Sequence, residues 1–362
     1  MKRRNLIILG GAAAATLAGA ILLAPDTTSR HDMTSAQAGL AFEGLAARLA
    51  NAQRIELRKH DGTLAIQRQG EDWVLPDKGG YRVRPERVRE LLVGLTELRL
   101  LEPRTSDRGQ LDRLGLDDPE NPGSTALLLR VLDGNGGAIA ELVIGRRRVR
   151  TQGNVPESVY VRRPGETQAW LAEGRLPADA DSQLWVDRDI ANLPKDRVRR
   201  VMVNRAGEPP LVLSRTDDAE AKLRMTEPAE HPPLDEVALD EVGRAFEFLT
   251  FVDVRPAAEM PGTALGEGSF LLTDDLTITV RPSKEGDTLW IRLEAQGSLE
   301  SALEAERLNA RWRGWAYQVG AWKEKAFVPR IEDLRSREQQ APPQPASPVE
   351  APAEAPAGTP AR

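Results

Sequence analysis

The stretch that decides the fold is RPERVRELLVGLTELRLLEP, residues 84–103. Its apolar side chains recur at helical spacing after a proline suited to a first turn: Val88, Leu91, Leu95 and Leu98. A second stretch, ALDEVGRAFEFLTFV at residues 238–252, repeats this pattern with Leu239, Val242, Phe246 and Leu249. The displacement is constant, since 239 minus 88 and 249 minus 98 are both 151. The sequence therefore predicts two matching helices in two related units.

The surrounding strands extend this match. At the same offset of 151, Leu114-Gly115 pairs with Leu265-Gly266, and LLLR at 127–130 pairs with ITVR at 278–281. Alternating strands precede both helices, so that Ile55 and Leu57 correspond to Val201 and Val203. After the helices the offset becomes 157 and pairs Tyr160 with Tyr317 and Trp170 with Phe327. We expect two tandem, similar α+β modules, residues 53–190 and 195–335, each a mostly antiparallel sheet with one main helix across a face.

The N-terminus carries a membrane signal. Lys2, Arg3 and Arg4 precede 19 uncharged residues, Leu6 to Ala24, which as a helix would span roughly 28 Å and cross a bilayer core. Residues 1–24 are therefore expected to form a single-pass anchor with the N-terminus inside. The alternative is a cleaved signal peptide, with small residues at Ala18-Gly19-Ala20. Either reading places the rest of the chain outside the cytoplasm, in the periplasm or another extracytoplasmic space, with the anchor in the bacterial inner membrane.

Two flanking segments complete the predicted organisation. Residues 25–52 are expected to include a stalk helix, because residues 34–52 place Leu40, Leu45 and Leu49 on one side. Residues 336–362 are rich in Pro, Ala and Glu and are expected to form a disordered tail.

Composition excludes several function classes. The chain of 362 residues has 49 basic and 55 acidic residues, and its net charge of −6 disfavours a nucleic-acid partner. It has no cysteine, which excludes disulfides, thiolate metal sites and cysteine nucleophiles. Neither a G-x-S-x-G elbow nor a P-loop occurs, and the three histidines lie far apart in sequence. We therefore expect no enzyme, no metal and no small-molecule cofactor.

Two acidic stretches are interpreted as turns. In RLGLDDPENP, residues 113–122, the carboxylates Asp117, Asp118 and Glu120 follow Leu114-Gly115. Calcium would require six to eight oxygens, so a turn with Gly115 at positive φ and Leu114 in the core is favoured. DGNGG at 133–137 begins like an EF-hand loop, but its twelfth position is Ile144, so a hairpin is favoured.

Two constellations are candidates for partner contact. GRRRVR, residues 145–150, places Arg146, Arg147, Arg148 and Arg150 after a strand end, where they would form a solvated loop or bind lipid headgroups, an acidic partner or an anionic wall polymer. RWRGWAYQVGAW, residues 311–322, reads as a hairpin whose tryptophans, Trp312 among them, pack in the core or offer a sugar-stacking or protein-contact surface. Trp312 is a candidate contact on condition that it is exposed.

The order of these landmarks resembles a known family. A W-x-L strand at residues 73–75, a helix, the LGLDDP turn, a strand closing at residues 142–145 and a VYV strand at residues 159–161 are similar to domain-of-unknown-function family 4340. The resemblance extends from about Gln53 to Leu334. It implies an N-terminal membrane helix and an extracytoplasmic accessory role beside ABC transporters of the gliding-motility type, with the transporter's membrane subunits as partners. It carries no catalytic residues.

Two functions follow as expectations. The first is a non-enzymatic, membrane-tethered scaffold or binding subunit of an ABC-type transport system in the cell envelope. The second is an envelope hydrolase that acts on glycans through a pair of carboxylates.

Overall fold

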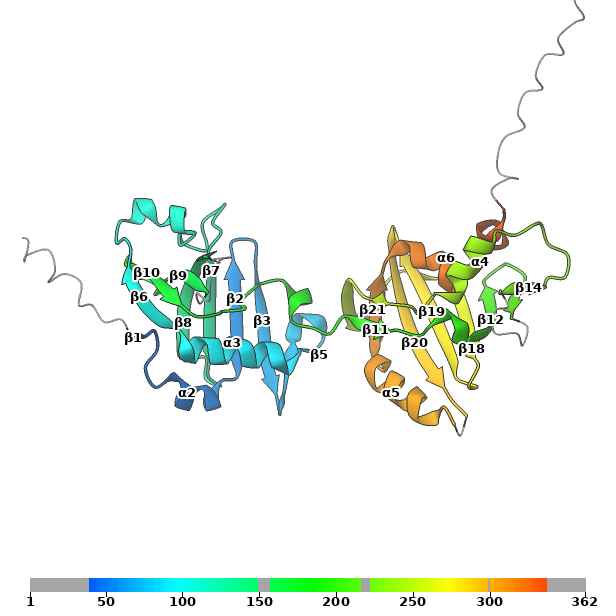
Figure 1. The fold of residues 1–362 in the computed structure, drawn as a ribbon, viewed down its shortest axis with the longest axis horizontal. Coiled ribbons are helices and arrows are strands. Elements are labelled where there is room, and N and C mark those ends of the chain that lie inside the picture. Colours follow the sequence, from blue (N-terminus) through cyan, green and yellow to red (C-terminus); the bar gives the residue numbers. More distant parts are fainter. Residues whose placement is uncertain (1–38, 149–156, 216–221, 299, 337–362) are drawn as a thin grey trace, which may run out of the picture. The chain divides into compact units, whose positions relative to one another are not determined.

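The computed structural model describes residues 39–148, 157–215, 222–298 and 300–336. The chain divides into two compact units, Met1–Asp187 and Arg188–Arg362 (Figure 1). Both consist mostly of antiparallel strands with a few helices, which confirms the predicted α+β class. The predicted anchor and the tail from residue 337 onward lie outside the described residues. Within those residues no helix is both long enough and apolar enough to cross a membrane.

The first unit is built on a ten-stranded sheet. Its strands follow one another in space as β1 (Gly39–Leu40), β6 (Arg99–Pro103), β10 (Ala169–Glu173), β9 (Ser158–Arg162), β8 (Ala138–Arg148), β7 (Leu127–Leu132), β2 (Arg54–Lys59), β3 (Gly62–Gln69), β4 (Asp72–Leu75) and β5 (Tyr81–Arg82). The predicted helix is present as α3 (Pro85–Glu97), with Pro85 in its first turn and Val88, Leu91 and Leu95 buried. DGNGG forms the predicted hairpin, since the Asp133 carboxylate accepts hydrogen bonds from the backbone of Asn135 and Gly137.

The two faces of this sheet are covered by different parts of the chain. On one face, along which α3 runs (Figure 1), Ile55, Leu57 and Val131 are buried. On the other, which we call the outer face, a long connection between β6 and β7 forms a small hydrophobic cluster with the strands. The cluster comprises Leu111, Leu116, Ala126, Val143 and Ala169, with Leu114, Leu128 and Tyr160 partly buried against it. We name this connection, residues 104–126, the first strap; it contains η4 (Arg108–Gln110) and η5 (Asp112–Leu114).

The first strap is held by glycine and arginine. Gly115 adopts φ 67° after η5, as predicted, and an added Cβ would lie 3.0 Å from Arg146 Cγ. Leu116, rather than the predicted Leu114, is the fully buried leucine of this turn. Arg162 is buried at the end of β9 and donates hydrogen bonds to the carbonyls of Leu116 (3.0 Å), Asp117 and Glu166. The LGLDDP turn is therefore a structural cover for the sheet.

The predicted stalk helix is wrong where the structure describes it. Residues 39–40 are strand β1, paired with β6, and only α2 (Leu45–Arg48) and η2 (Leu49–Asn51) are helical. Leu45 is buried, and the Arg48 guanidinium donates to the carbonyl of Ile139 on β8. Residues 39–52 thus belong to the first unit, because strand pairing and burial fix them to its edge.

The second unit is built on a nine-stranded sheet. Its main path runs through β14 (Arg224–Glu227), β13 (Leu211–Ser214), β12 (Val198–Arg205), β18 (Gly266–Leu272), β19 (Thr277–Glu285), β20 (Thr288–Gln296), β21 (Trp315–Val319) and β16 (Asp253–Pro256), and β17 (Thr263–Ala264) pairs with β19. A separate pair joins β11 (Asp189–Ala191) to β15 (Leu249–Thr250). The helices are α4 (Glu236–Gly243), α5 (Ala302–Trp312) and α6 (Glu324–Phe327). Short 3₁₀ turns complete the chain at η3 (Pro76–Lys78), η6 (Ser182–Leu184), η7 (Lys195–Arg197), η8 (Ala257–Glu259), η9 (Ala321–Lys323) and η10 (Ile331–Leu334).

The core of the second unit is aromatic. The ring of Phe246, just beyond α4, lies edge-on to Phe270 of β18 at 4.9 Å and 5.8 Å from Phe327 of α6. α4 is shorter than predicted, because it ends at Gly243 while Phe246 and Leu249 are buried beyond it. The predicted hairpin at residues 311–322 is also wrong. This stretch ends helix α5, forms β21 and turns through η9.

A short connection, which includes β17, packs against β19 of the second sheet beside Arg281 and Ser283, whose face of the sheet we call its outer face. We name residues 257–265, between β16 and β18, the second strap. The Ser283 hydroxyl donates to the Pro261 carbonyl at 2.5 Å, and the backbone N–H of Leu265 donates to the Pro282 carbonyl at 3.0 Å. Gly262 has φ 85°, and an added Cβ would lie 2.3 Å from the Lys284 carbonyl oxygen, so only glycine allows this close approach.

Corresponding strands follow one another in the same spatial order in the two sheets. The path β6-β10-β9-β8-β7-β2-β3-β4 in the first has its counterpart in β16-β21-β20-β19-β18-β12-β13-β14 in the second. Ile55 on β2 lies opposite Val131 on β7, and Val201 on β12 lies opposite Phe270 on β18. β7 thus occupies the place of β18.

The predicted register beyond the helices is therefore wrong. The offset of 151 matches LLLR on β7 with ITVR on β19, and the offset of 157 matches Tyr160 on β9 with Tyr317 on β21, one strand away in each case. It also matches Gly115, which ends η5, with Gly266, which begins β18. The physical reason is that apolar alternation repeats every second residue in any half-buried strand, so it does not distinguish one strand from its neighbour.

Candidate functional site

The predicted arginine cluster lies in a strand rather than a loop. Arg146, Arg147 and Arg148 are the last residues of β8, and Arg150 lies outside the described residues. The Arg147 guanidinium donates to the carbonyls of Leu176 (2.5 Å) and Ala178, so it fastens the segment after β10. Arg146 and Arg148 are exposed. Arg147 is exposed too, so the cluster consists of three exposed arginines, one of which also fastens the backbone.

Trp312 is not available for partner contact. Its side chain is 1% exposed, and its indole N–H donates to the carbonyl of Ile190 at 2.9 Å. Trp322, by contrast, is 64% exposed at η9. The condition set for Trp312 as a contact residue, that it be exposed, is therefore not met, because Trp312 ends α5 and anchors that helix to β11.

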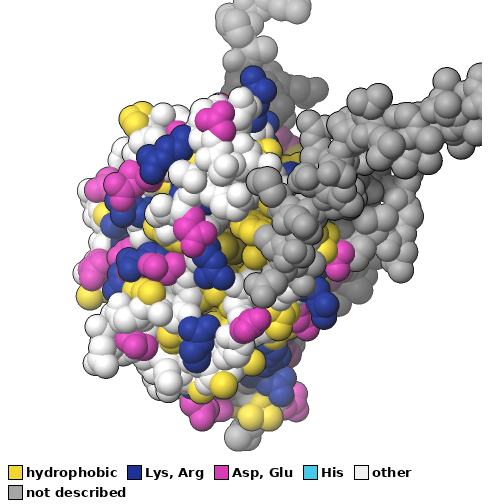
Figure 2. Space-filling model, turned by 90° about the vertical axis from the view of Figure 1, so that its left-hand side faces the viewer, with side chains coloured by type: hydrophobic (Ala, Val, Ile, Leu, Met, Phe, Trp, Pro, Cys, Tyr) yellow, Lys and Arg dark blue, Asp and Glu magenta, His cyan; other side chains and the backbone are white. Residues whose placement is uncertain are grey.

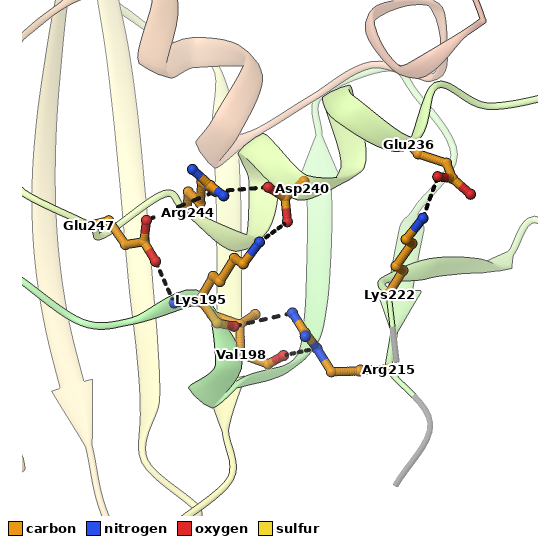
Figure 3. Close-up of polar contacts among 8 residues, drawn as sticks. All are labelled: Lys195, Val198, Arg215, Lys222, Glu236, Asp240, Arg244 and Glu247. Atoms are coloured by element: carbon orange, nitrogen blue, oxygen red, sulfur yellow. Dashed lines mark hydrogen bonds and ion pairs between the residues drawn. The ribbon is translucent and has the colours of Figure 1, made fainter. Parts of the chain in front are cut away.

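A charged cluster beside α4 is structural. The Lys195 ammonium lies 2.7 Å from Asp240, which also accepts from Arg244, and the Lys195 backbone N–H donates to Glu247 (Figure 3). Arg215 donates to the carbonyls of Lys195 and Val198. These groups satisfy one another and the backbone, so the cluster ties the start of β12 to α4.

Among the described residues, the first unit has a broad hollow of about 740 Å³ at its β1 edge. Arg163 closes part of it, with its guanidinium 5.5 Å from the centre of the Phe42 ring and bonded to the Ala41 carbonyl. Figure 2 shows a side of the molecule on which acidic, basic and apolar side chains are interspersed. Both arginines of the hollow, Arg48 and Arg163, already bind backbone carbonyls.

The second unit has a different kind of depression, which we name the arginine groove. Two hollows of about 450 and 420 Å³ are both lined by Ala257 of the second strap and by Arg281 and Arg292. One extends to Glu294, Arg313 and Trp315, and the other to Met260 and Glu267. The pairing between β20 and β21 ends at Ile291 and Tyr317. The first hollow lies beyond this end and is lined by residues 292–294 and 313–315.

Arg281 organises the carboxylates of the groove. Its guanidinium binds Glu267 of β18 at 2.9 Å and Glu294 of β20 at 3.0 Å. The hydrogen bond to Glu294 raises the pKa of Arg281, and the same bond holds the pKa of Glu294 below its usual range. Arg313 lowers the pKa of Glu294 further as a more distant positive charge. Arginine thus holds the Glu294 carboxylate ionised.

Arg292 and Arg313 differ from Arg281. Arg292 lies directly opposite Arg281 in the ladder between β19 and β20, so their side chains share one face. Within the described part of the chain, neither Arg292 nor Arg313 lies within ion-pair distance of a carboxylate. Both are exposed. In the described part of the chain, the groove therefore offers two exposed arginines outside ion-pair distance of a carboxylate, beside the partly buried indole of Trp315.

Comparison with known proteins places this chain in a family. Antiparallel sheets covered by straps, with an open charged groove, define an α+β protein whose outer faces differ between its two units. The sequence model described as Domain of unknown function (DUF4340) matches residues 73–266, which is 194 of 362 residues, and the chain belongs to this family. No curated protein and no solved structure matched it.

Sequence reasoning missed the arginine groove. Arg281 and Arg292 stand eleven positions apart on two strands (292 minus 281), and only the register of the hairpin makes them neighbours. One signal was present: both strands alternate apolar and polar residues, which predicts that their polar positions share a face. The register that sets Arg281 opposite Arg292 was not readable from that alternation.

Proposed function

We propose that this protein is a non-enzymatic, membrane-tethered binding or scaffold subunit, accessory to an ABC-type transport system of the bacterial cell envelope. Residues 6–24 anchor it in the inner membrane with the N-terminus inside, and both units lie in the periplasm or another extracytoplasmic space. The N-terminal charge pattern and the apolar length support the anchor. The resemblance to the family supports the transporter partner.

One observation carries the choice of binding over catalysis. Glycoside hydrolysis requires a carboxylic acid with a raised pKa beside a second, ionised carboxylate. In the groove Glu267 and Glu294 both bind Arg281, and the pKa of Glu294 is lowered. A carboxylate with a lowered pKa, such as Glu294, accepts hydrogen bonds from a ligand but does not donate a proton to a leaving group. The groove therefore supports a binding function, and the glycan hydrolase is the weaker alternative.

We further propose that the two units are copies of one module. The parallel strand orders of the two sheets support this, as does the placement of one crossing strap on each outer face. After duplication, residues that maintain the fold would persist in both copies. Features in only one copy, such as the unpaired arginines of the second, are then the best candidates for a ligand.

The partner is tested by affinity purification of the full chain from gently solubilised membranes. We expect membrane subunits of an ABC transporter to co-purify, and to be lost when residues 1–24 are replaced by an unrelated membrane helix or when partner-binding surfaces are altered. A chain with Arg146 and Arg148 both replaced by Gln tests the exposed part of the β8 cluster. Purification that recovers no transporter subunit would overturn the accessory role.

The topology is tested separately by adding protease to cells whose outer barrier has been opened. We expect digestion of both units while cytoplasmic marker proteins survive. A soluble mature chain that begins near Ile21 would instead show that the N-terminal segment is a cleaved signal peptide.

A further inference from the structure

We propose that the arginine groove binds an acidic oligosaccharide, a chain of sugars that carry both carboxylates and hydroxyl groups. This inference rests on the proposed binding function and names its ligand class. The groove is elongated, because its two hollows meet at Ala257, Arg281 and Arg292. An extended chain can pass along it and contact the second strap on the way.

The arginines indicate that the ligand is an anion. Like charges directly opposite in a ladder destabilise a sheet, and Arg281 faces Arg292 in this way. Glu267 and Glu294 both bind Arg281, and the three arginines of the groove against these two glutamates leave a net positive charge of one. A carboxylate bound between these guanidinium groups would form charge-assisted, bidentate hydrogen bonds and remove the repulsion. The chain as a whole has a net charge of −6, so this local positive charge opposes the overall balance.

A third cation lies on the same face. The Arg255 guanidinium of β16 is 4.2 Å from the centre of the Trp290 ring, and Trp290 stands two residues before Arg292 on β20. Alternate residues of a strand share a face, so Trp290 lies on the same face as Arg292 and Arg281. Arg255, which stacks on Trp290, therefore lies on that face too. The positive charge thus extends across several strands rather than being confined to one pair.

The carboxylates favour a sugar over an acidic peptide. Glu267 and Glu294 line the groove, and their ionised oxygens would repel a polymer that carries only carboxylates. Hydroxyl groups donate hydrogen bonds to such oxygens. Trp315 adds an apolar ring at the rim of one hollow, against which the C–H face of a sugar can pack. A mixed lining of arginine, glutamate and indole matches a ligand with anionic, hydroxylated and weakly apolar parts.

The test measures binding of oligogalacturonate to the full chain in detergent, by isothermal titration at low salt. Two further probes separate the alternatives: the methyl ester of the same oligosaccharide, which has no charge, and poly-glutamate of equal length, which has no hydroxyl groups. The Arg292→Gln/Arg313→Gln variant removes the two unpaired cations. The Arg84→Gln/Arg89→Gln variant is the matched control, since it removes two exposed arginines at the start of α3 in the first unit.

We expect oligogalacturonate to bind the unaltered chain and the control variant alike. The groove variant should bind it at least about tenfold more weakly with an unchanged melting temperature, and the methyl ester should bind as weakly to the unaltered chain. Equal binding of the ester, tighter binding of poly-glutamate, equal binding by the groove variant or no binding at all would each overturn the proposal. Loss of sugar binding with intact co-purification of transporter subunits would refute this inference alone, whereas sugar binding without co-purification would refute the accessory role alone.

Discussion

The outer faces of the two sheets are closed in different ways. In the first unit the long strap, residues 104–126, forms a hydrophobic cluster on the sheet through Leu111 and Leu116, and Arg162 binds its carbonyls. In the second unit the short strap, residues 257–265, leaves charged side chains open beside it. Two sheets with the same strand order thus carry different covers on their outer faces, a longer apolar one in the first unit and a shorter one in the second.

A second comparison concerns the charges on these faces. Each sheet has an arginine between two glutamates of neighbouring strands. Arg130 on β7 binds Glu56 on β2 and Glu141 on β8, at 3.4 and 2.7 Å. Arg281 on β19 binds its two glutamates in the same manner, but β19 takes the place of β8 rather than β7. The two networks share a local pattern and differ in position by one strand.

The largest expected effect is the loss of stability when a core side chain of either unit is truncated. Leu95 of α3 is 0% exposed and Phe246 is 1% exposed, so Leu95→Ala and Phe246→Ala should each lower the free energy of unfolding by about 2 to 5 kcal/mol through lost burial and the cavity left behind. If the units fold independently, each variant should shift one of two thermal transitions. Differential scanning calorimetry measures both.

Exposed positions provide controls for these core variants. Val93 of α3 is 43% exposed and Phe248 is 80% exposed, so replacement of either by Ala should change stability by no more than about 0.5 kcal/mol. A single transition that moves equally in both core variants would contradict two independent modules.

The first strap can be loosened without touching the second unit. Arg162→Met should cost about 1 to 3 kcal/mol, because the carbonyls of Leu116, Asp117 and Glu166 lose their donor. Hydrogen exchange should quicken at residues 111–116 and stay unchanged at residues 257–265. Arg148→Met, at an exposed position of β8, serves as the control. Unchanged exchange in the first strap would refute the role assigned to Arg162.

The second unit also contains a titratable group in its core. Lys323 is 5% exposed, donates to the carbonyls of Arg244 and Ala245, and burial lowers its pKa to about 8. Between pH 8 and pH 10.5 the unfolded chain binds more protons at this lysine than the folded chain does, so stability should rise with pH. The gain should be on the order of 2 kcal/mol, because nearby water screens part of the charge.

The variant Lys323→Met tests whether Lys323 causes this rise in stability with pH. Its stability measured by urea unfolding should lack the rise between pH 8 and pH 10.5, whatever its absolute value. Lys325→Met, at an exposed position two residues further on, should keep the rise. The same slope in Lys323→Met and the unaltered chain would show that another group causes it.

The smallest effect distinguishes the two arginines that face each other in the groove. Arg292→Gln should change stability by less than about 0.5 kcal/mol, and in the stabilising direction, because it removes a like-charge pair. Arg281→Gln should cost roughly 1 kcal/mol, because it breaks ion pairs to Glu267 and Glu294 that are partly open to solvent. Equal destabilisation by both would mean that Arg292 has a structural partner.

Much of the fold was predictable from local patterns. Pro85 and the spacing of Val88, Leu91 and Leu95 gave α3, and the glycines of DGNGG gave the hairpin after β7. The length of α4 was not predictable, because Phe246 continues the apolar spacing yet is buried by tertiary contacts with Phe270 and Phe327. Nor was the helix that ends at Trp312 predicted, because residues 311–322 were interpreted as a hairpin.

The site was less predictable than the fold. Arg146, Arg147 and Arg148 attract attention because they are consecutive, but Arg147 is used to fasten the backbone. Arg292 and Arg313 stand singly in the sequence and are brought to one groove by strand register and by the end of α5. Register is set by pairing between distant segments, and apolar alternation alone did not specify it.

The central claim is that the arginines of the groove in the second unit are open to a ligand, whereas Arg162 of the first unit is buried and bonded to the first strap. The most direct measurement is arginine-specific labelling of the full chain with phenylglyoxal, read peptide by peptide by mass spectrometry. The account predicts fast modification of Arg292 and Arg313, protection of both by oligogalacturonate, and slow modification of Arg162 until the chain is denatured. Modification of Arg162 as fast as that of Arg292, or protection of Arg292 without any added ligand, would contradict it.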